Sequence, residues 1–142
     1  MIAIGSDHAG ISLKQEIMKF LKKIDVEYKD FGTYNDESVD YPIYGKKVAD
    51  VVQKGECEKG IIICGTGIGI SIAANKVKGI RAALCHDVFS AKMTRLHNDA
   101  NVLALGSRVI GSGLALEIVN AFICTEFSDE ERHLNRIKML EG

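Results

Sequence analysis

The chain has 142 residues, of which 46 % are apolar, and its formal net charge at pH 7 is −1. These values predict one folded domain spanning residues 1–142, and the near-neutral charge gives no reason to expect nucleic acid or an anionic membrane as a partner. No stretch approaches the ~18 apolar residues of a membrane span. Four cysteines at scattered spacing favour a reducing cytoplasm over a disulfide framework or a zinc module.

The first third of the chain alternates strand and helix patterns. Residues 2–5 are an apolar run ended by glycine, and residues 11–24 carry apolar side chains at helical spacing, with Lys14 assigned to the opposite polar face together with the later lysines. Residues 26–31 alternate as a strand near a sheet edge does. A polar loop then leads to the only proline, Pro42, which suits the first turn of a second helix.

The alternation continues to the end of the chain. Strands are predicted at 59–64, 81–85 and 101–105, and helices at 69–77, 88–96, 111–122 and 129–140. Nearly all-apolar strands between helices predict a three-layer α/β/α Rossmann-like sandwich, with a five-stranded parallel sheet and an extra C-terminal helix. Ligands of such sheets bind beyond the carboxyl ends of the strands. The polar residues expected at that edge are Asp7, His8, Cys64 to Gly69, His86, Asp87 and Arg108.

The stretch from Gly60 to Ser71 is the hardest to explain by folding alone. Three isoleucines predict a buried strand, and the glycines at alternate positions after Cys64 would bring bare amide groups to the start of a helix, an arrangement that attracts anions. Cys64 at this hinge would be favoured as a thiolate. The alternative is that Cys64 is a small buried hydrophobe and that the glycines only make a tight turn.

Three other glycine-loop chemistries fit this stretch poorly. Ile70 stands where a dinucleotide fingerprint needs its third glycine, although Asp87 lies about twenty residues further on, as such a fingerprint expects. A nucleotide-hydrolase loop needs Gly-Lys-Ser/Thr, and Gly65-Thr66 has no lysine. A cysteine phosphatase would need an arginine where Ile70 stands. The chemistry that remains for this loop is proton transfer by a thiolate, with the amide groups binding an oxyanion.

Each of the other polar motifs has a functional and a structural interpretation. Asp7 could orient His8 or cap the following helix, and His97, between a helix and a buried strand, could be a general acid/base or part of a polar loop. Arg132 and Arg136 lie four apart, a spacing that suits a phosphate between them or a solvated face. Lys92 and Arg95 are predicted to be a solvated face, and His86 and Cys85 lack the spacing of a metal site.

Taken together, these motifs resemble the ribose-5-phosphate isomerase B family from end to end. The resemblance rests on Ser6 to Gly10, Asp40-Tyr41-Pro42, Cys64 to Lys76, His97 to Asn101, and Arg132 with Arg136. The wider family also contains galactose-6-phosphate isomerase subunits and enzymes acting on allose 6-phosphate. It is metal-independent, uses no cofactor, and forms homodimers or homotetramers with active sites at subunit interfaces.

The resemblance implies a role for each matching residue. Cys64 would be the base that moves a proton between C2 and C1, Thr66 would assist at the substrate oxygens, and His97, helped by Asp7 or Asn98, would open the sugar ring. The enediolate would be held by the amides of Gly65, Thr66, Gly67, Ile68 and Gly69. The phosphate would be bound by His8, Arg108, Arg132 and Arg136, some of them from a neighbouring subunit, and the sugar by Asp40 and Tyr41.

The expected function is therefore the interconversion of ribose 5-phosphate and ribulose 5-phosphate in the cytoplasm. A hexose 6-phosphate isomerase, acting on allose or galactose 6-phosphate, is the alternative within the same class. A non-catalytic sugar-phosphate sensor built on the same fold is the alternative from a different class.

Overall fold

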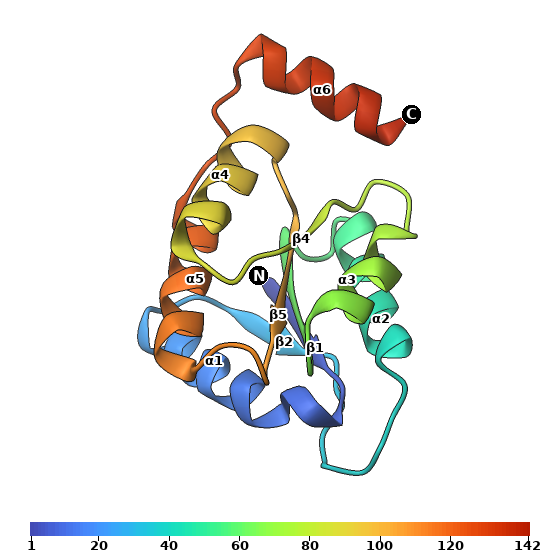
Figure 1. The fold of residues 1–142 in the computed structure, drawn as a ribbon, viewed down its shortest axis with the longest axis vertical. Helices are drawn as coiled ribbons and strands as arrows, with labels where there is room; N and C mark the ends of the chain where they lie inside the picture. The colour runs from blue at the N-terminus through green and yellow to red at the C-terminus, as the bar shows by residue number, and fades with distance from the viewer.

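The computed structural model describes all residues, 1–142, and contains one five-stranded parallel sheet (Figure 1). The strands run in the order β2-β1-β3-β5-β4, and every pair of neighbours is parallel. Their bounds are β1 Ile2–Ser6, β2 Tyr28–Asp30, β3 Lys59–Cys64, β4 Ala82–Leu84 and β5 Val102–Gly106. The predicted α/β sandwich is confirmed, and the two edge strands are shorter than their sequence patterns.

Helices cover both faces of this sheet. Their bounds are α1 Ile11–Lys23, α2 Tyr41–Gln53, α3 Ile68–Asn75, α4 Val88–Asn98, α5 Ser112–Cys124 and α6 Glu131–Glu141, and a short 3-10 turn, η1 (His8–Gly10), precedes α1. In Figure 1, α1, α4 and α5 lie on one side of the sheet and α2 and α3 on the other. Pro42 is in the first turn of α2, as predicted.

Strand alternation divides the apolar residues between two cores. In β3, Ile61 and Ile63 pack with α1 and α5, whereas Ile62 and Cys64 pack with α2 and α3. Because successive strand residues point to opposite faces, alternate residues of a strand belong to different cores. Cys64 therefore faces the layer that also contains the helix following it.

Lys14 is a correction to the predicted polar face of α1. Its side chain is 1 % exposed, and its ammonium donates to Asp30 Oδ1 at 2.8 Å and to the carbonyl of Thr33. Lys14 lies three residues before Ile17 and seven before Leu21, and so belongs to the buried stripe of the helix. The charge is accommodated because Asp30, the last residue of β2, and Thr33, just after it, supply the two oxygens.

Helix α6 occupies a different place from the other helices. It lies across the end of α4, away from either face of the sheet (Figure 1), and its contacts with the rest of the fold are mainly with α4. No helix of the chain is both long and apolar enough to cross a membrane.

Candidate active site

Cys64 is the last residue of β3 and lies under the glycine loop that starts α3. Its side chain is 4 % exposed, and its Sγ accepts a hydrogen bond from the backbone N–H of Gly67 at 3.2 Å. Gly67 has φ +76°, and a Cβ there would lie 2.6 Å from Leu84 Cδ1 and 2.7 Å from the carbonyl carbon of Leu105. Only glycine can therefore place this donor against the sulfur.

Thr66 and the first amides of α3 form the outer part of the loop. The N–H of Ile68 donates to Thr66 Oγ1 at 3.2 Å, so the hydroxyl hydrogen of Thr66 remains available as a donor. Two amides of the expected cradle are thus already used inside the loop, that of Gly67 by sulfur and that of Ile68 by Thr66. The N–H of Gly69, in the first turn of the helix, has no intrahelical acceptor and is free for an anion.

Arg108 and Tyr41 lie directly against the glycines of this loop. A Cβ on Gly65 would be 3.1 Å from Arg108 Nη1, and a Cβ on Gly69 would be 2.5 Å from the Tyr41 ring. The backbone of Arg108 is fixed as well, because its N–H donates to the carbonyl of Gly65 at 3.0 Å. The glycines therefore allow a guanidinium and a phenol to approach the loop closely.

Asp7 and His8 follow β1 at the same edge. Asp7 Oδ1 accepts from the N–H groups of Ala9 at 3.0 Å and Gly10 at 3.2 Å, which confirms the capping interpretation. His8 Nδ1 accepts from the N–H of Val39 at 3.1 Å, so neutral His8 carries its proton on Nε2. That N–H is a donor for a ligand. Asp40, just beyond Val39, makes no capping hydrogen bond with the helix it precedes.

His86 is the second histidine at this edge. Its Nε2 accepts from the N–H of Gly106 at 3.1 Å, and Gly106 is the strand partner of Cys64. A Cβ on Gly106 would lie 2.5 Å from the carbonyl oxygen of Thr66. His86 therefore supports the loop from behind.

The remaining expected residues lie at the opposite edge of the sheet. His97 and Asn98 end α4, and a helix that joins two parallel strands ends where the next strand begins. The N–H of Gly60, at the start of β3, donates to the carbonyl of Asn101 at 2.9 Å, which places this turn beside the first residues of β3. Cys64 is at the other end of that strand, about 16 Å away at ~3.3 Å per residue.

The side chains at this opposite edge are largely exposed. His97 stacks on His133 of α6 with ring centroids 4.4 Å apart and the planes at 16°. Burial, and next the charge of His97, lower the pKa of His133. Arg132 is 65 % exposed and its Nε donates to Glu130 Oε2 at 2.8 Å, and Arg136 is also exposed.

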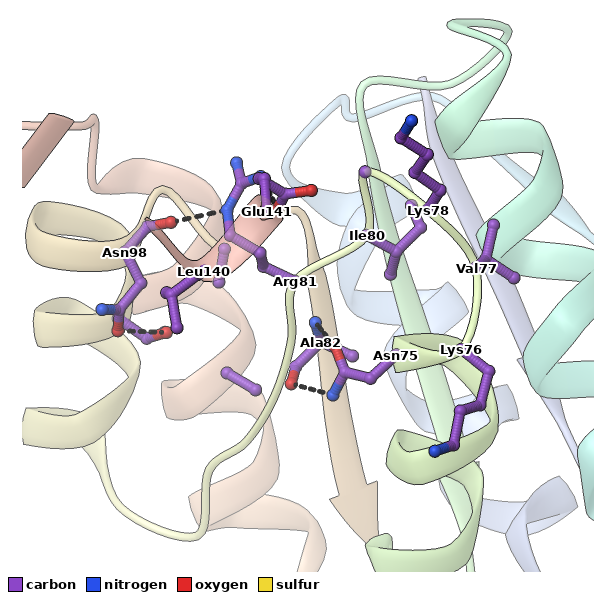
Figure 2. Close-up of a pocket in the computed structure, with 14 residues that line it drawn as sticks. Asn75, Lys76, Val77, Lys78, Ile80, Arg81, Ala82, Asn98, Leu140 and Glu141 are labelled. Carbon is purple, nitrogen blue, oxygen red and sulfur yellow. Dashed lines mark hydrogen bonds and ion pairs between the residues drawn. The ribbon is translucent and has the colours of Figure 1, made fainter. Parts of the chain in front are cut away.

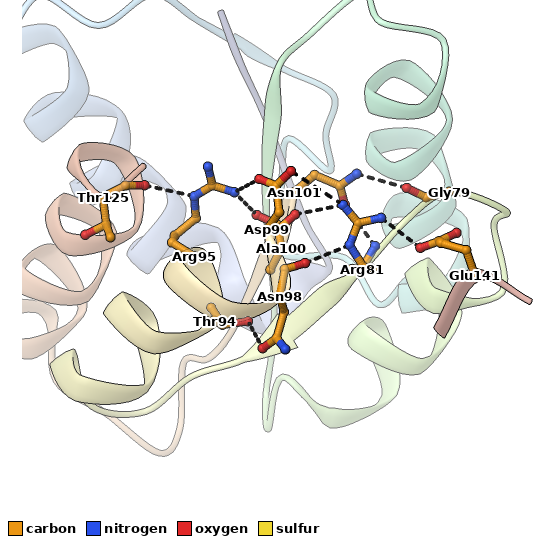
Figure 3. A network of polar contacts seen from close by, with 10 residues as sticks. All are labelled: Gly79, Arg81, Thr94, Arg95, Asn98, Asp99, Ala100, Asn101, Thr125 and Glu141. Atoms are coloured by element: carbon orange, nitrogen blue, oxygen red, sulfur yellow. Dashed lines mark hydrogen bonds and ion pairs between the residues drawn. The ribbon is translucent and has the colours of Figure 1, made fainter. Parts of the chain in front are cut away.

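Two arginines that the sequence reading left without a role hold the last turn of α4 (Figure 3). Arg95 was predicted on a solvated face, but it is 6 % exposed, and donates to Asp99 Oδ1 at 2.8 Å, to the carbonyl of Ala100 at 2.7 Å and to that of Thr125 at 3.0 Å. The prediction was wrong because the segment after α5 covers this side of α4. Arg81 approaches the same turn from the chain before β4.

A cleft of about 560 Å³ opens beside this turn (Figure 2). Arg81, Asn98 and Glu141 are among the residues that line it, together with the segment that joins α3 to β4. Asn98, which lines the cleft, is also the residue that the sequence motif places beside His97 in the expected site. This cleft is therefore at the His97 edge, not at the Cys64 edge.

One chain thus assembles only part of the expected site. The residues that meet at the carboxyl edge of the sheet are Asp7, His8, Asp40, Tyr41, Cys64, Gly65, Thr66, Gly67, Ile68, Gly69 and Arg108. His97, Asn98, Arg132 and Arg136 meet at the other end. No group of three or more His, Cys, Asp or Glu side chains lies close enough together to hold a metal ion.

Parallel α/β sandwiches bind small molecules beyond the carboxyl ends of their strands, which is where this chain has a cysteine held by a glycine loop. The family described as Ribose/Galactose Isomerase matches residues 2–140, and the chain belongs to this family.

Similar proteins match nearly the whole chain. The solved structure of ribose-5-phosphate isomerase B from Clostridium thermocellum has 58 % sequence identity and a TM-score of 0.97, over 99 % of this chain and 94 % of that one. Ribose-5-phosphate isomerase B of Escherichia coli is 50 % identical over 98 % of this chain and 93 % of its own length. The galactose-6-phosphate isomerase subunit LacB of Clostridium acetobutylicum is 41 % identical, over 99 % of this chain and 82 % of its own length.

Proposed function

We propose that the chain is an aldose–ketose isomerase that interconverts D-ribose 5-phosphate and D-ribulose 5-phosphate, a step of the non-oxidative pentose phosphate pathway. The observation that carries this proposal is the buried Sγ of Cys64, which accepts the N–H of Gly67 at 3.2 Å at the start of α3. A backbone donor and the positive end of a helix both stabilise negative charge on sulfur. In its thiolate form, Cys64 would act as a base at the position where this fold binds ligands.

The reaction moves one carbon-bound proton and needs no oxidant. Once the ring is open, the Cys64 thiolate takes the proton from C2 of the aldose. The C2–H bonding pair forms a C1=C2 double bond, and the π pair of the C1 carbonyl moves onto O1 to give the enediolate. The thiol then returns the proton to C1, while a proton moves from O2 to O1 with the Thr66 hydroxyl as relay. The Gly69 amide and the helix start stabilise the oxyanion without reorganising.

Phosphate binding positions C1 and C2 against Cys64. On this chain the donors are the Nε2–H of His8 and the exposed guanidinium of Arg108, which lies over Gly65. Because the phosphate lies several bonds from the reacting carbons, its binding energy can be used to orient them. Arg132 and Arg136 would add two guanidinium groups, but they lie at the far end of the same chain.

A second copy of the chain resolves this separation. In a two-fold dimer each chain can present His97, Asn98, Arg132 and Arg136 to the Cys64 edge of the other, giving two composite sites. Exposed apolar side chains on the helices that begin at the Cys64 edge could pack against such a copy, since Ile68 and Ile72 of α3 and Phe89 of α4 are 52 %, 54 % and 71 % exposed. We propose a homodimer, or a homotetramer built from such dimers.

The cellular setting follows from the same chemistry. The four cysteines are all free thiols, which suits the reducing cytoplasm.

The mechanism uses only side chains and amides of the protein, so we expect activity without any cofactor or metal ion, and full activity after treatment with a chelator.

The direct test is conversion of ribose 5-phosphate by the purified protein, compared with Cys64→Ala and Cys64→Ser. We expect both variants to fold and to lose about 10³-fold in kcat, within the range of a general base. Absence of ketose formation by the unaltered protein would refute the proposal, and an active Cys64→Ala variant would refute the assigned base.

A hexose 6-phosphate substrate is the second candidate, because the family includes the LacB subunit, which is 41 % identical to this chain. Comparing kcat/KM on ribose 5-phosphate, allose 6-phosphate and galactose 6-phosphate separates the two, since one more carbon requires a deeper pocket near Tyr41 and the partner's His97 end. A sensor without catalytic activity would bind these sugars with no turnover and equally well after Cys64→Ser.

The composite site has its own test. Cys64→Ala and Arg136→Ala are each expected to be inactive or nearly so, but a mixture that exchanges subunits should recover part of the activity. In the hybrid, one site combines an intact Cys64 edge with an intact Arg136 end. No recovery after confirmed exchange would place both residues in one subunit's site.

A further inference from the structure

Helix α6 is held to the rest of the chain at its two ends. Near its beginning, His133 stacks on His97 at 4.4 Å, and just before it the N–H of Ser128 donates to the carbonyl of Leu96 at 3.3 Å. At its other end, Glu141 Oε1 accepts from Arg81 Nη1 at 2.7 Å. The helix has 11 residues, which is about 16 Å at 1.5 Å per residue, so these two attachments set its direction.

Arg81 uses all three nitrogens of its guanidinium in this arrangement (Figure 3). Nε donates to the carbonyl of Asn98 at 2.8 Å, Nη2 to that of Asp99 at 2.9 Å, and Nη1 to the carboxylate of Glu141 at 2.7 Å. The side chain is 20 % exposed. The planar fork of arginine can bind these three acceptors at fixed angles, which lysine cannot do.

The two carbonyls are those that a helix end leaves without partners. Asn98 ends α4 and Asp99 is its C-cap in the left-handed region at φ +44°, so both carbonyls point out of the helix toward a cation. Arg95 holds the same turn from the other side, through Asp99 Oδ1 and the carbonyl of Ala100. Arg81 connects this turn to the carboxyl end of α6, and the His97–His133 stack connects it near the beginning of that helix.

We propose that Arg81 is a positioning residue that locks α6 to the last turn of α4, so that His97 and Asn98 on one element and Arg132 and Arg136 on the other act as a single rigid unit. This inference rests on the proposed function, in which that unit completes the site of a second copy. An exposed ion pair stabilises a fold very little. Its effect is on geometry, because a helix released at one end can pivot about the other.

The sharpest variant is Glu141→Ala, which removes the link to α6 and leaves both carbonyl contacts of Arg81 in place. We expect KM for ribose 5-phosphate to rise about tenfold with kcat within about twofold, because misplaced phosphate ligands weaken binding and small displacements have large effects. Glu141→Gln retains an acceptor oxygen and should fall between Glu141→Ala and the unaltered protein. Glu131→Ala is the control, since it removes the same charge from an exposed position of the same helix.

Hybrid dimers distinguish positioning from a general loss of structure. When Glu141→Ala is mixed with a large excess of Cys64→Ala, nearly all Glu141→Ala chains are in hybrid dimers. The only active site of such a hybrid combines the intact Cys64 of the first chain with the unaltered α6 of the second. That hybrid should show the KM of the unaltered protein. A raised KM in the hybrid, with subunit exchange confirmed by mass spectrometry, would overturn the inference.

Different results would overturn the role of Arg81 and the proposed function. Unchanged KM in Glu141→Ala, in a protein that isomerises ribose 5-phosphate and loses activity in Cys64→Ala, overturns only the role of Arg81. An active Cys64→Ala variant, or no isomerisation by the unaltered protein, overturns the function on which the role depends.

Discussion

The two ends of the sheet hold the proposed site residues in opposite ways. At the Cys64 edge, positions are set by backbone: a left-handed glycine, close approaches at three other glycines, and a sulfur that is 4 % exposed. At the α6 end they are set by side chains, through an imidazole stack and arginines that bind carbonyls and carboxylates. The first end is suited to holding a reacting atom rigidly, and the second to approaching a partner from outside.

The largest effect should come from the buried charge that supports the first end. Lys14→Met removes the ammonium that joins Asp30 to the carbonyl of Thr33, at the start of the loop whose Val39 N–H donates to His8. We expect a loss of about 3–5 kcal/mol in the free energy of unfolding, typical of breaking a buried ion pair. Urea denaturation measures it.

Lys19→Met is the matched control for Lys14. It lies on the same helix and pairs with Glu16 at 3.7 Å, but its side chain is 77 % exposed. We expect a change within about 0.5 kcal/mol, as for other exposed ion pairs. Equal losses from the two variants would contradict the claim that burial sets the difference.

Glycine substitutions test how tightly the loop is built. Gly67→Ala adds a Cβ at φ +76°, in collision with Leu84 and Leu105, and moves the donor from Cys64 Sγ. We expect a loss of about 2–4 kcal/mol in stability from strain and overpacking, and a fall in kcat of about 10²-fold.

Gly55→Ala separates conformation from crowding. Gly55 has φ +79°, and nothing lies within 4 Å of a Cβ added there. The Gly55→Ala variant should therefore lose only the free energy of placing alanine in the left-handed region, about 1 kcal/mol, and should keep kcat unchanged. Denaturation curves and initial rates of the two variants give both quantities. A similar loss of activity in both would refute the role assigned to Gly67.

The α6 end should make stability depend on pH. Burial and the adjacent His97 lower the pKa of His133, so the folded chain binds this proton less readily than the unfolded chain, whose histidines titrate near 6.5. The contribution is full above pH ~6.5 and is lost as the pH falls below it. Urea midpoints at pH 7.5 and 5.5 should therefore differ less in His133→Asn than in the unaltered protein.

The smallest effect concerns Cys85, one of the two buried cysteines besides Cys64. Burial, and next Asp87, raise the pKa of Cys85 to about 11, so it should not react with a thiol reagent at pH 8 in the folded protein, whereas exposed Cys124 should react at once. Counting modified thiols with time, in native buffer and in urea, measures this. Cys85→Ser should retain activity, unlike Cys64→Ser.

The same contrast explains what the sequence could predict. The five strands, the helices and the glycine loop follow from apolar period and glycine spacing, which are local properties. Lys14 and Arg95 were assigned to solvated faces, because their burial depends on oxygens that come from Thr33 and Thr125, far along the chain. Arg81 carried no local signal at all, since its acceptors lie 17, 18 and 60 residues away.

The separation of the two ends was also beyond local patterns. A histidine or an arginine pair can be recognised from its motif, but the edge of the sheet at which it lies depends on the direction of the helix that carries it. His97 stands at the end of α4 rather than at its start, which is why it lies beside the beginning of β3. The direction of each helix therefore decides whether the expected site residues form one site or two half-sites in a single chain.

Asn75 at the end of α3 has a consequence for how copies of this chain can associate. Its amide donates to the carbonyl of Ala82 at 2.9 Å and accepts the N–H of the same residue at 2.8 Å, as a neighbouring strand would. The outer side of β4, a three-residue edge strand, is thus partly occupied by a side chain of its own chain. These two hydrogen bonds therefore discourage growth of the sheet by strand addition on this side.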